Sequence, residues 1–234
     1  MTAPQPTPGP SKSLNLDEMD WQALFKRHGQ KIAIGASALV IAAAAVWLYI
    51  SSEQRKETFA AQELEQARSE AEAGNLPLAT SDLTRLIDRF GGTRAADQAV
   101  ISLNQIRLIQ GQRDVAINAL QQFVRSRLPD YVAASAYGLL GGGLEDQGKL
   151  REAGAAYRQA AGRAELDFQK AGFLLDAGRT LAASGDSTGA KASYGEVLAK
   201  YGALDQAAEA RVRMAELGGV VPAPADSVAP RSRT

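Results

Sequence analysis

The clearest pattern in the chain is an apolar stripe that follows each of four evenly spaced glycines. The glycines lie 37 residues apart and are Gly74, Gly111, Gly148 and Gly185. In every copy an alanine lies five residues after the glycine, and apolar residues lie nine and twelve residues after it. Because steps of four and three residues return to the same face of an α-helix, the pattern predicts an amphipathic helix after each glycine.

A second helical pattern precedes the glycines. It is clearest in Tyr137, Leu140 and Leu144, and again in Phe173, Leu174, Ala177 and Leu181. One repeat is therefore helix, glycine turn, helix, and the glycine is expected at a positive φ that residues with a Cβ resist. The alternative is chance periodicity in an alanine-rich chain. It requires the same spacing and residue classes to recur over three intervals by coincidence.

These residues resemble a known repeat family. Leu140, Gly141, Gly148, Ala153 and Tyr157 are similar to the leucine, small residue, turn glycine, alanine and aromatic of the tetratricopeptide pattern. The resemblance covers about residues 57 to 217. It implies an all-α fold in which about three to four helical hairpins form an α-solenoid.

The chain also departs from that family. Its period is 37 residues, whereas the family repeats every ~34 residues. The helix-ending proline is missing, and Asn104 stands where Gly141 and Gly178 stand in the next two copies. The first copy has Gln66 in place of a leucine, so we interpret it as a capping or linking unit. The additional residues are expected between one glycine turn and the next first helix, in stretches such as residues 91–93 and 128–130.

An uncharged apolar run of nineteen residues, Ile32 to Ile50, precedes the repeats. As a helix it spans about 28 Å, long enough to cross a bilayer. Trp47 and Tyr49 near its end suit a membrane interface. A buried core helix is one alternative, although only Ser37 interrupts the apolar surface. A cleaved signal peptide is another, although 31 residues precede the run and no clean small-residue cleavage site follows it.

Basic residues on the two sides of this run indicate its orientation. Lys12, Lys26, Arg27 and Lys31 precede it, and Arg55, Lys56 and Arg68 follow it. This small bias favours an N-terminus in the cytosol of a bacterium and a repeat domain in the periplasm, with one pass through the inner membrane.

The expected organisation has four parts. Residues 1–31 form a cytosolic segment with a short amphipathic helix at Asn15 to Gln30, and residues 32–50 form the transmembrane helix. Residues 51–217 form the repeat domain, beginning with a helical stretch from Glu53 to Ala73 that continues from the span. Residues 218–234, rich in Pro, Ala and Ser, are expected to be a disordered tail.

The composition argues against most other classes of function. The chain has 26 basic and 26 acidic residues and no basic helical stripe, which argues against nucleic-acid binding. It has no cysteine, and its single histidine, His28, lies at the expected membrane edge. A catalytic triad or a thiolate or histidine metal site therefore lacks its residues. We expect no enzyme activity, no cofactor, no metal and no small-molecule substrate.

The order of segments is similar to that of the YfgM-like family, ancillary subunits of the Sec translocon. The resemblance implies a membrane-anchored periplasmic scaffold that binds translocon subunits, chaperones or secreted chains. A structural subunit of a larger membrane complex and a cytosol-facing repeat adaptor are the alternatives. The sequence leaves the partner and the oligomeric state open.

Binding by such arrays uses a concave face built from the first helix of each repeat. Positions six and three residues before each turn glycine are expected there: Gln105, Leu108, Gly142, Glu145, Arg179 and Ala182. These residues lack the lysine and asparagine cluster of a carboxylate clamp, so we expect broad, weak contacts with a protein segment. The alternative is that they contact a neighbouring helix or the C-terminal helix Leu204 to Leu217. The glycine run 141–143 fits either close helix packing or close approach by a bound peptide.

Overall fold

In a computed structural model, the structure describes residues 21–126 and 128–220, and this part of the chain is helical with short connections and no strand. The prediction of an all-α chain is thus confirmed for these residues. The helices are α1 (Trp21–Glu72), α2 (Leu76–Phe90), α3 (Arg94–Ile109), α4 (Arg113–Arg125), α5 (Asp130–Asp146), α6 (Leu150–Arg163), α7 (Asp167–Ala183), α8 (Ser187–Lys200) and α9 (Gln206–Glu216). The chain divides into two compact units, Met1–Gln54 and Arg55–Thr234.

The described part of the first unit is the N-terminal portion of α1. No helix boundary separates the segment expected to lie at the membrane surface from the apolar run, because α1 is continuous from Trp21. Residues 1–20, which include the start of that expected amphipathic helix, lie outside the described residues. From Ala33 onward α1 is long and apolar enough to cross a membrane. Its apolar side chains are exposed, including Leu39 (73%) and Trp47 (66%), so the described chain does not bury them.

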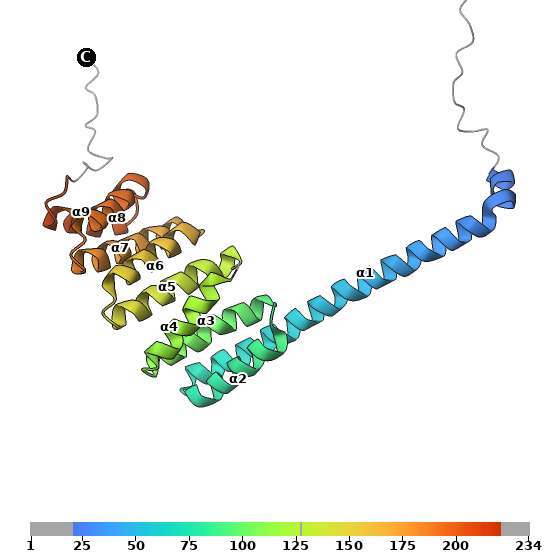
Figure 1. The fold of residues 1–234 in the computed structure, drawn as a ribbon, viewed down its shortest axis with the longest axis horizontal. Coiled ribbons are helices and arrows are strands. Elements are labelled where there is room, and N and C mark those ends of the chain that lie inside the picture. The colour runs from blue at the N-terminus through green and yellow to red at the C-terminus, as the bar shows by residue number, and fades with distance from the viewer. Residues whose placement is uncertain (1–20, 127, 221–234) are drawn as a thin grey trace, which may run out of the picture. The chain divides into compact units, whose positions relative to one another are not determined.

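In the second unit, consecutive helices pack as hairpins, which Figure 1 shows as a series from α2 to α9. The C-terminal part of α1 is the first helix of the first hairpin, since Ala60, Leu64 and Ala67 share a buried cluster with Leu83 and Leu86 of α2. The unmatched Gln66 is exposed and leaves that packing intact. The other hairpins are α3–α4, α5–α6 and α7–α8, and α9 packs against α7 and α8.

The four repeat glycines lie in the turns inside the hairpins. Their φ values are +85° at Gly74, +76° at Gly111, +74° at Gly148 and +85° at Gly185. At Gly148 the glycine N–H donates to the carbonyl of Glu145 at 2.8 Å, and the next N–H donates to Leu144 at 2.9 Å. The same pair of bonds recurs at the other three glycines. It satisfies carbonyls left open at a helix end, in the manner of a Schellman motif.

The connections between hairpins are residues 91–93, 126–129 and 164–166. In the first of these, Gly92 has φ +87°, and the Thr93 hydroxyl accepts from the Ala96 N–H at 3.1 Å to cap α3. In the second, Pro129 directly precedes α5. It disfavours helical geometry at the residue before it, which opposes an earlier start of the helix.

Alanines at the fifth position of each copy allow the helices of a hairpin to approach closely. Ala79, Ala116, Ala153 and Ala190 are all 0% exposed. The ninth position is also buried and holds Leu83, Leu120, Tyr157 and Tyr194. In the glycine run, a Cβ at Gly141 would lie 2.8 Å from the Tyr157 ring, and one at Gly143 would lie 3.0 Å from Ile117. Those two glycines therefore serve close packing.

Residues 221–234, most of the expected disordered tail, lie outside the described residues. The helix before them, α9, is shorter than the expected Leu204 to Leu217. It ends at Glu216, and Gly218 (φ +65°) repeats the turn geometry of the four repeat glycines. In that geometry the Gly218 N–H donates to Ala215 and the Gly219 N–H donates to Met214.

Candidate functional site

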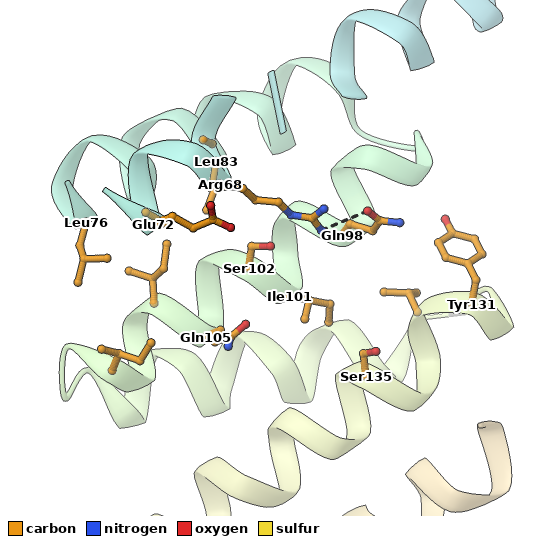
Figure 2. A pocket seen from close by; sticks show the side chains of 15 residues that line it. Arg68, Glu72, Leu76, Leu83, Gln98, Ile101, Ser102, Gln105, Tyr131 and Ser135 are labelled. Carbon is orange, nitrogen blue, oxygen red and sulfur yellow. Dashed lines mark hydrogen bonds between the residues drawn. The ribbon is translucent and has the colours of Figure 1, made fainter. Parts of the chain in front are cut away.

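A groove of about 590 Å³ lies on the second unit, bounded by the first helices of three successive hairpins. Residues of α1 and α5 form its sides, α3 runs along its floor, and Leu76 of α2 lies at one end (Figure 2). It is lined by Ala67, Arg68, Ala71, Glu72, Leu76, Leu83, Gln98, Ile101, Ser102, Gln105, Ile106, Ile109, Tyr131, Val132 and Ser135. Its volume falls in the range of about 300–1,000 Å³ that is typical of ligand sites.

The polar part of the groove is a row of neutral side chains on α3. Gln98, Ser102 and Gln105 are spaced by four and three residues, so they share one face of the helix, as Figure 2 shows. The guanidinium of Arg68 on α1 donates to the side-chain amide oxygen of Gln98 at 3.3 Å. Gln105 is exposed, and its side chain makes no hydrogen bond within the described residues. The row therefore retains unused amide and hydroxyl groups.

The apolar part of the groove comes from Ile101, Ile106, Ile109, Leu76 and Val132. Ile109 is 68% exposed at the C-terminal end of α3. Single exposed apolar side chains are common on protein surfaces. This one lies where a ligand in the groove could cover it.

A hydrogen-bonded tyrosine closes the end of the groove nearest the start of α5. The Tyr131 hydroxyl donates to the Asp97 carboxylate at 2.6 Å, and the guanidinium carbon of Arg94 lies 4.6 Å from the ring centroid. Burial and the hydrogen bond to Asp97 raise the pKa of Tyr131 to about 12. The Tyr131 side chain is therefore neutral at physiological pH and is held in place at this end of the groove.

The six residues expected on a concave face divide between different environments. Gln105 lines the groove. Leu108 packs toward α5, where its Cδ2 would lie 3.2 Å from a Cβ at Gly143. Gly142 is half-buried, and a Cβ there would meet only the Tyr157 hydroxyl, at 3.5 Å. Arg179 and Ala182 line a smaller cavity of about 280 Å³ together with Arg213, Glu216 and Leu217.

Glu145, the remaining expected residue, is the centre of an ionic cluster that joins α5 to α7. Arg179 binds both carboxylate oxygens of Glu145, with one contact at 3.0 Å, and also contacts Asp176 at 3.3 Å. The Tyr157 hydroxyl donates to Glu145 at 3.2 Å. The hydrogen bonds from Arg179 hold the pKa of Glu145 below its ordinary value. Contacts within the chain therefore occupy this part of the face.

Sequence reasoning missed most of the groove, although the repeat register contains the signal. Arg68 and Ala71 lie six and three residues before Gly74, in the positions that Gln105 and Leu108 hold before Gly111. Both line the groove. Gln66, which departs from the leucine of the later copies, obscures this correspondence in the sequence.

The described residues contain no group of three or more His, Asp or Glu side chains that could hold a metal ion. The polar groups of the groove are amides, hydroxyls and one pair of opposite charges, which can bind a polar ligand by hydrogen bonding. No protein-family model matches the sequence, and a search of curated proteins finds no match.

Proposed function

We propose that this chain is a membrane-anchored scaffold that binds other proteins through its helical hairpins. The observation that carries the proposal is the groove on α1, α3 and α5, with its unused amide groups and exposed Ile109. Such a lining suits a polypeptide, because it offers amide groups for hydrogen bonds beside an exposed apolar side chain.

The hairpins form a tetratricopeptide-like solenoid in this proposal. It is supported by the constant spacing of Gly74, Gly111, Gly148 and Gly185 and by the identical hydrogen bonds at their turns. In a solenoid each hairpin buries its apolar stripe against its neighbours, so the first helices can present a binding face. In this chain the open part of that face is the groove on α1, α3 and α5.

The anchor in this proposal is the apolar part of α1, in the bacterial inner membrane, with the hairpins in the periplasm. The exposed Leu39 and Trp47 and the basic residues before the span support this placement. The similarity in segment order to the YfgM-like family favours translocon subunits, chaperones or emerging secreted chains as partners.

A site-specific photo-crosslink in cells tests the scaffold function. A photoreactive amino acid replaces Gln105 in the groove or, as a control, Gln122, an exposed glutamine of α4 outside it. We expect a discrete adduct with another protein from position 105 and none from position 122. Equal adducts at both positions, or none at 105, contradict a groove-directed scaffold.

Protease treatment of spheroplasts tests the location. Hairpins in the periplasm are degraded while the inner membrane is intact, and α1 then stays with the membrane. Degradation only after lysis contradicts the periplasmic assignment. The mass of the mature chain separates an anchor from a cleaved signal peptide, since cleavage removes the residues before the hairpins.

A further inference from the structure

A separate cavity of about 300 Å³ lies between α6, α7 and α8, and it shares no residue with the groove on α1, α3 and α5. It is lined by Arg158, Ala161, Gly162, Lys170, Leu174, Glu196, Lys200 and Tyr201. Ala161 and Leu174 belong to the buried apolar cluster of this part of the chain. The three basic side chains come from three different helices, so the cavity gathers positive charge from each of the elements that bound it.

The positive charge of this cavity is only partly compensated within the described residues. The Lys200 ammonium contacts the Glu196 carboxylate at 2.8 Å, and the Lys170 ammonium contacts Asp167 at 2.9 Å. Arg158 is exposed and forms no ion pair or hydrogen bond within the described part of the chain. Because Glu196 is the one carboxylate among the lining residues, the lining carries a net of two positive charges.

The two lysines of the cavity lie close enough for their charges to interact. The hydrogen bond to Asp167 raises the pKa of Lys170, and the neighbouring charge of Lys200 opposes that rise. The hydrogen bond to Glu196 raises the pKa of Lys200. Both ammonium groups are therefore charged at physiological pH, and they repel each other. A bound anion would relieve this repulsion.

The repeat architecture does not account for this cluster of cations. Arg158 lies ten residues after the turn glycine, a position that the other copies fill with Thr84, Gln121 and Gly195. Lys200 lies in the last turn of α8, where a cation interacts favourably with the helix dipole. Arg158 precedes the last turn of α6, and Lys170 lies near the start of α7, where the dipole disfavours a cation. The helix dipole thus explains only one of the three cations.

The donors of the cavity suit a tetrahedral anion with two charges. Guanidinium and ammonium groups form charge-assisted hydrogen bonds to phosphate oxygens, and groups from three helices can each take a different oxygen. The Tyr201 hydroxyl is a further donor, and it makes no hydrogen bond within the described residues. A dianion matches the net charge of the lining, whereas a carboxylate or chloride leaves one positive charge uncompensated.

We propose that the cavity between α6, α7 and α8 binds a phosphate group through Arg158, Lys170 and Lys200. The phosphate group is either a free anion or the headgroup of a lipid, since both present the same oxygens to these three side chains. This site lies on a different surface from the groove and does not depend on the proposed scaffold function.

A phosphorus NMR titration tests the site. The full chain is kept in a maltoside detergent without phosphate or sulfate, and the two probes are inorganic phosphate and dihexanoyl phosphatidic acid, a lipid with a phosphate monoester headgroup. The test variant is Arg158→Gln, and the control is Arg125→Gln on α4. Both arginines are exposed and form no ion pair within the described residues, but Arg125 lies outside the cavity. Arg158→Gln should weaken binding by about tenfold or more, and Arg125→Gln should leave it unchanged.

Glu196→Gln provides a test with the opposite sign. It removes the carboxylate from the lining and frees the Lys200 ammonium, so it should tighten binding by about threefold or more. A general loss of folding cannot weaken binding in one variant and tighten it in the other.

The two probes distinguish the sources of the phosphate group. Variant-dependent binding of the lipid alone assigns a lipid headgroup, and variant-dependent binding of inorganic phosphate shows that the anion suffices. Binding of neither probe, equal losses in Arg158→Gln and Arg125→Gln, weaker binding in Glu196→Gln, or acetate that competes as well as phosphate overturns the proposal.

Discussion

The ring of Tyr194 on α8 lies directly against the backbone of Gly178 on α7. A Cβ built on Gly178 would lie 2.7 Å from Cζ and 2.8 Å from Cδ1 of that ring, closer than side chains approach one another. The preceding copy repeats the relationship with Gly141 and Tyr157. In the first copy the corresponding residues are Ala67 and Leu83, which are both buried in one cluster. A large aromatic ring therefore packs against a glycine, whereas the smaller leucine packs with an alanine.

Gly178→Ala should therefore destabilise the chain. Alanine is favoured over glycine in a helix by about 1 kcal/mol, but overpacking a core costs about 1–3 kcal/mol. We expect a net loss, measured as a lower urea midpoint of the full chain in mild detergent. Adding Tyr194→Leu to Gly178→Ala should restore part of the lost stability. The pair is then alanine and leucine, as Ala67 and Leu83 are in the first copy.

Gly172→Ala is the matched control for that prediction. Gly172 also lies within α7, but a Cβ there meets nothing within 4 Å. Only the gain in helix propensity remains, so this variant should be slightly more stable than the wild type. A loss of stability at Gly172 as large as at Gly178 would show that contact with Tyr194 is not the cause.

Gly148→Ala tests the turn geometry separately from packing. A Cβ at Gly148 meets open space, but the residue has φ +74°. The left-handed conformation costs a residue with a Cβ about 1–2 kcal/mol, so the urea midpoint should fall. The urea midpoint of Gly148→Asn should fall less, because asparagine adopts the left-handed conformation more readily than alanine does. Equal losses for alanine and asparagine would contradict a conformational origin.

The repeat pattern predicted the fold better than the site. Helix periodicity and glycine turns are local properties, so the 37-residue register was sufficient to place Gly148 between two helices. The site depends on which face stays open after packing. Glu145 and Arg179 have the correct phase for an exposed face, yet they bind each other across two hairpins. A pairing between residues 34 apart depends on the stacking geometry, which a repeat pattern does not encode.

Glu57→Ala should loosen the start of α3. The Glu57 carboxylate accepts hydrogen bonds from the N–H groups of Arg94 at 2.8 Å and Ala95 at 3.0 Å. It thus satisfies two of the donors that a helix leaves open at its N-terminus, where a negative charge is also favourable. Loss of a cap costs about 0.5–2 kcal/mol. Hydrogen exchange of the Arg94 and Ala95 amides should quicken, whereas the exposed Glu65→Ala should leave it unchanged.

Glu145→Gln should reduce stability in a manner that depends on pH. Hydrogen bonds from Arg179 lower the pKa of Glu145 in the folded chain from the ordinary 4.5. The unfolded chain therefore takes up this proton first on acidification. The stabilisation is fully present above the unfolded pKa and is lost as the pH falls through the folded pKa. Because the pair is partly exposed, we expect it to contribute about 0.5–1 kcal/mol near pH 7.

The measurement compares urea midpoints of the wild type and Glu145→Gln over a pH series. The difference should be largest near neutrality and should narrow as the pH falls below about 4.5, the ordinary value. Added salt should also reduce the difference in urea midpoint at neutral pH, because it screens the ion pair. Glu152→Gln is the control, since Glu152 is exposed on α6 and forms no ion pair within the described part of the chain. A difference that stays constant or grows on acidification would rule out the Glu145–Arg179 contact as its source.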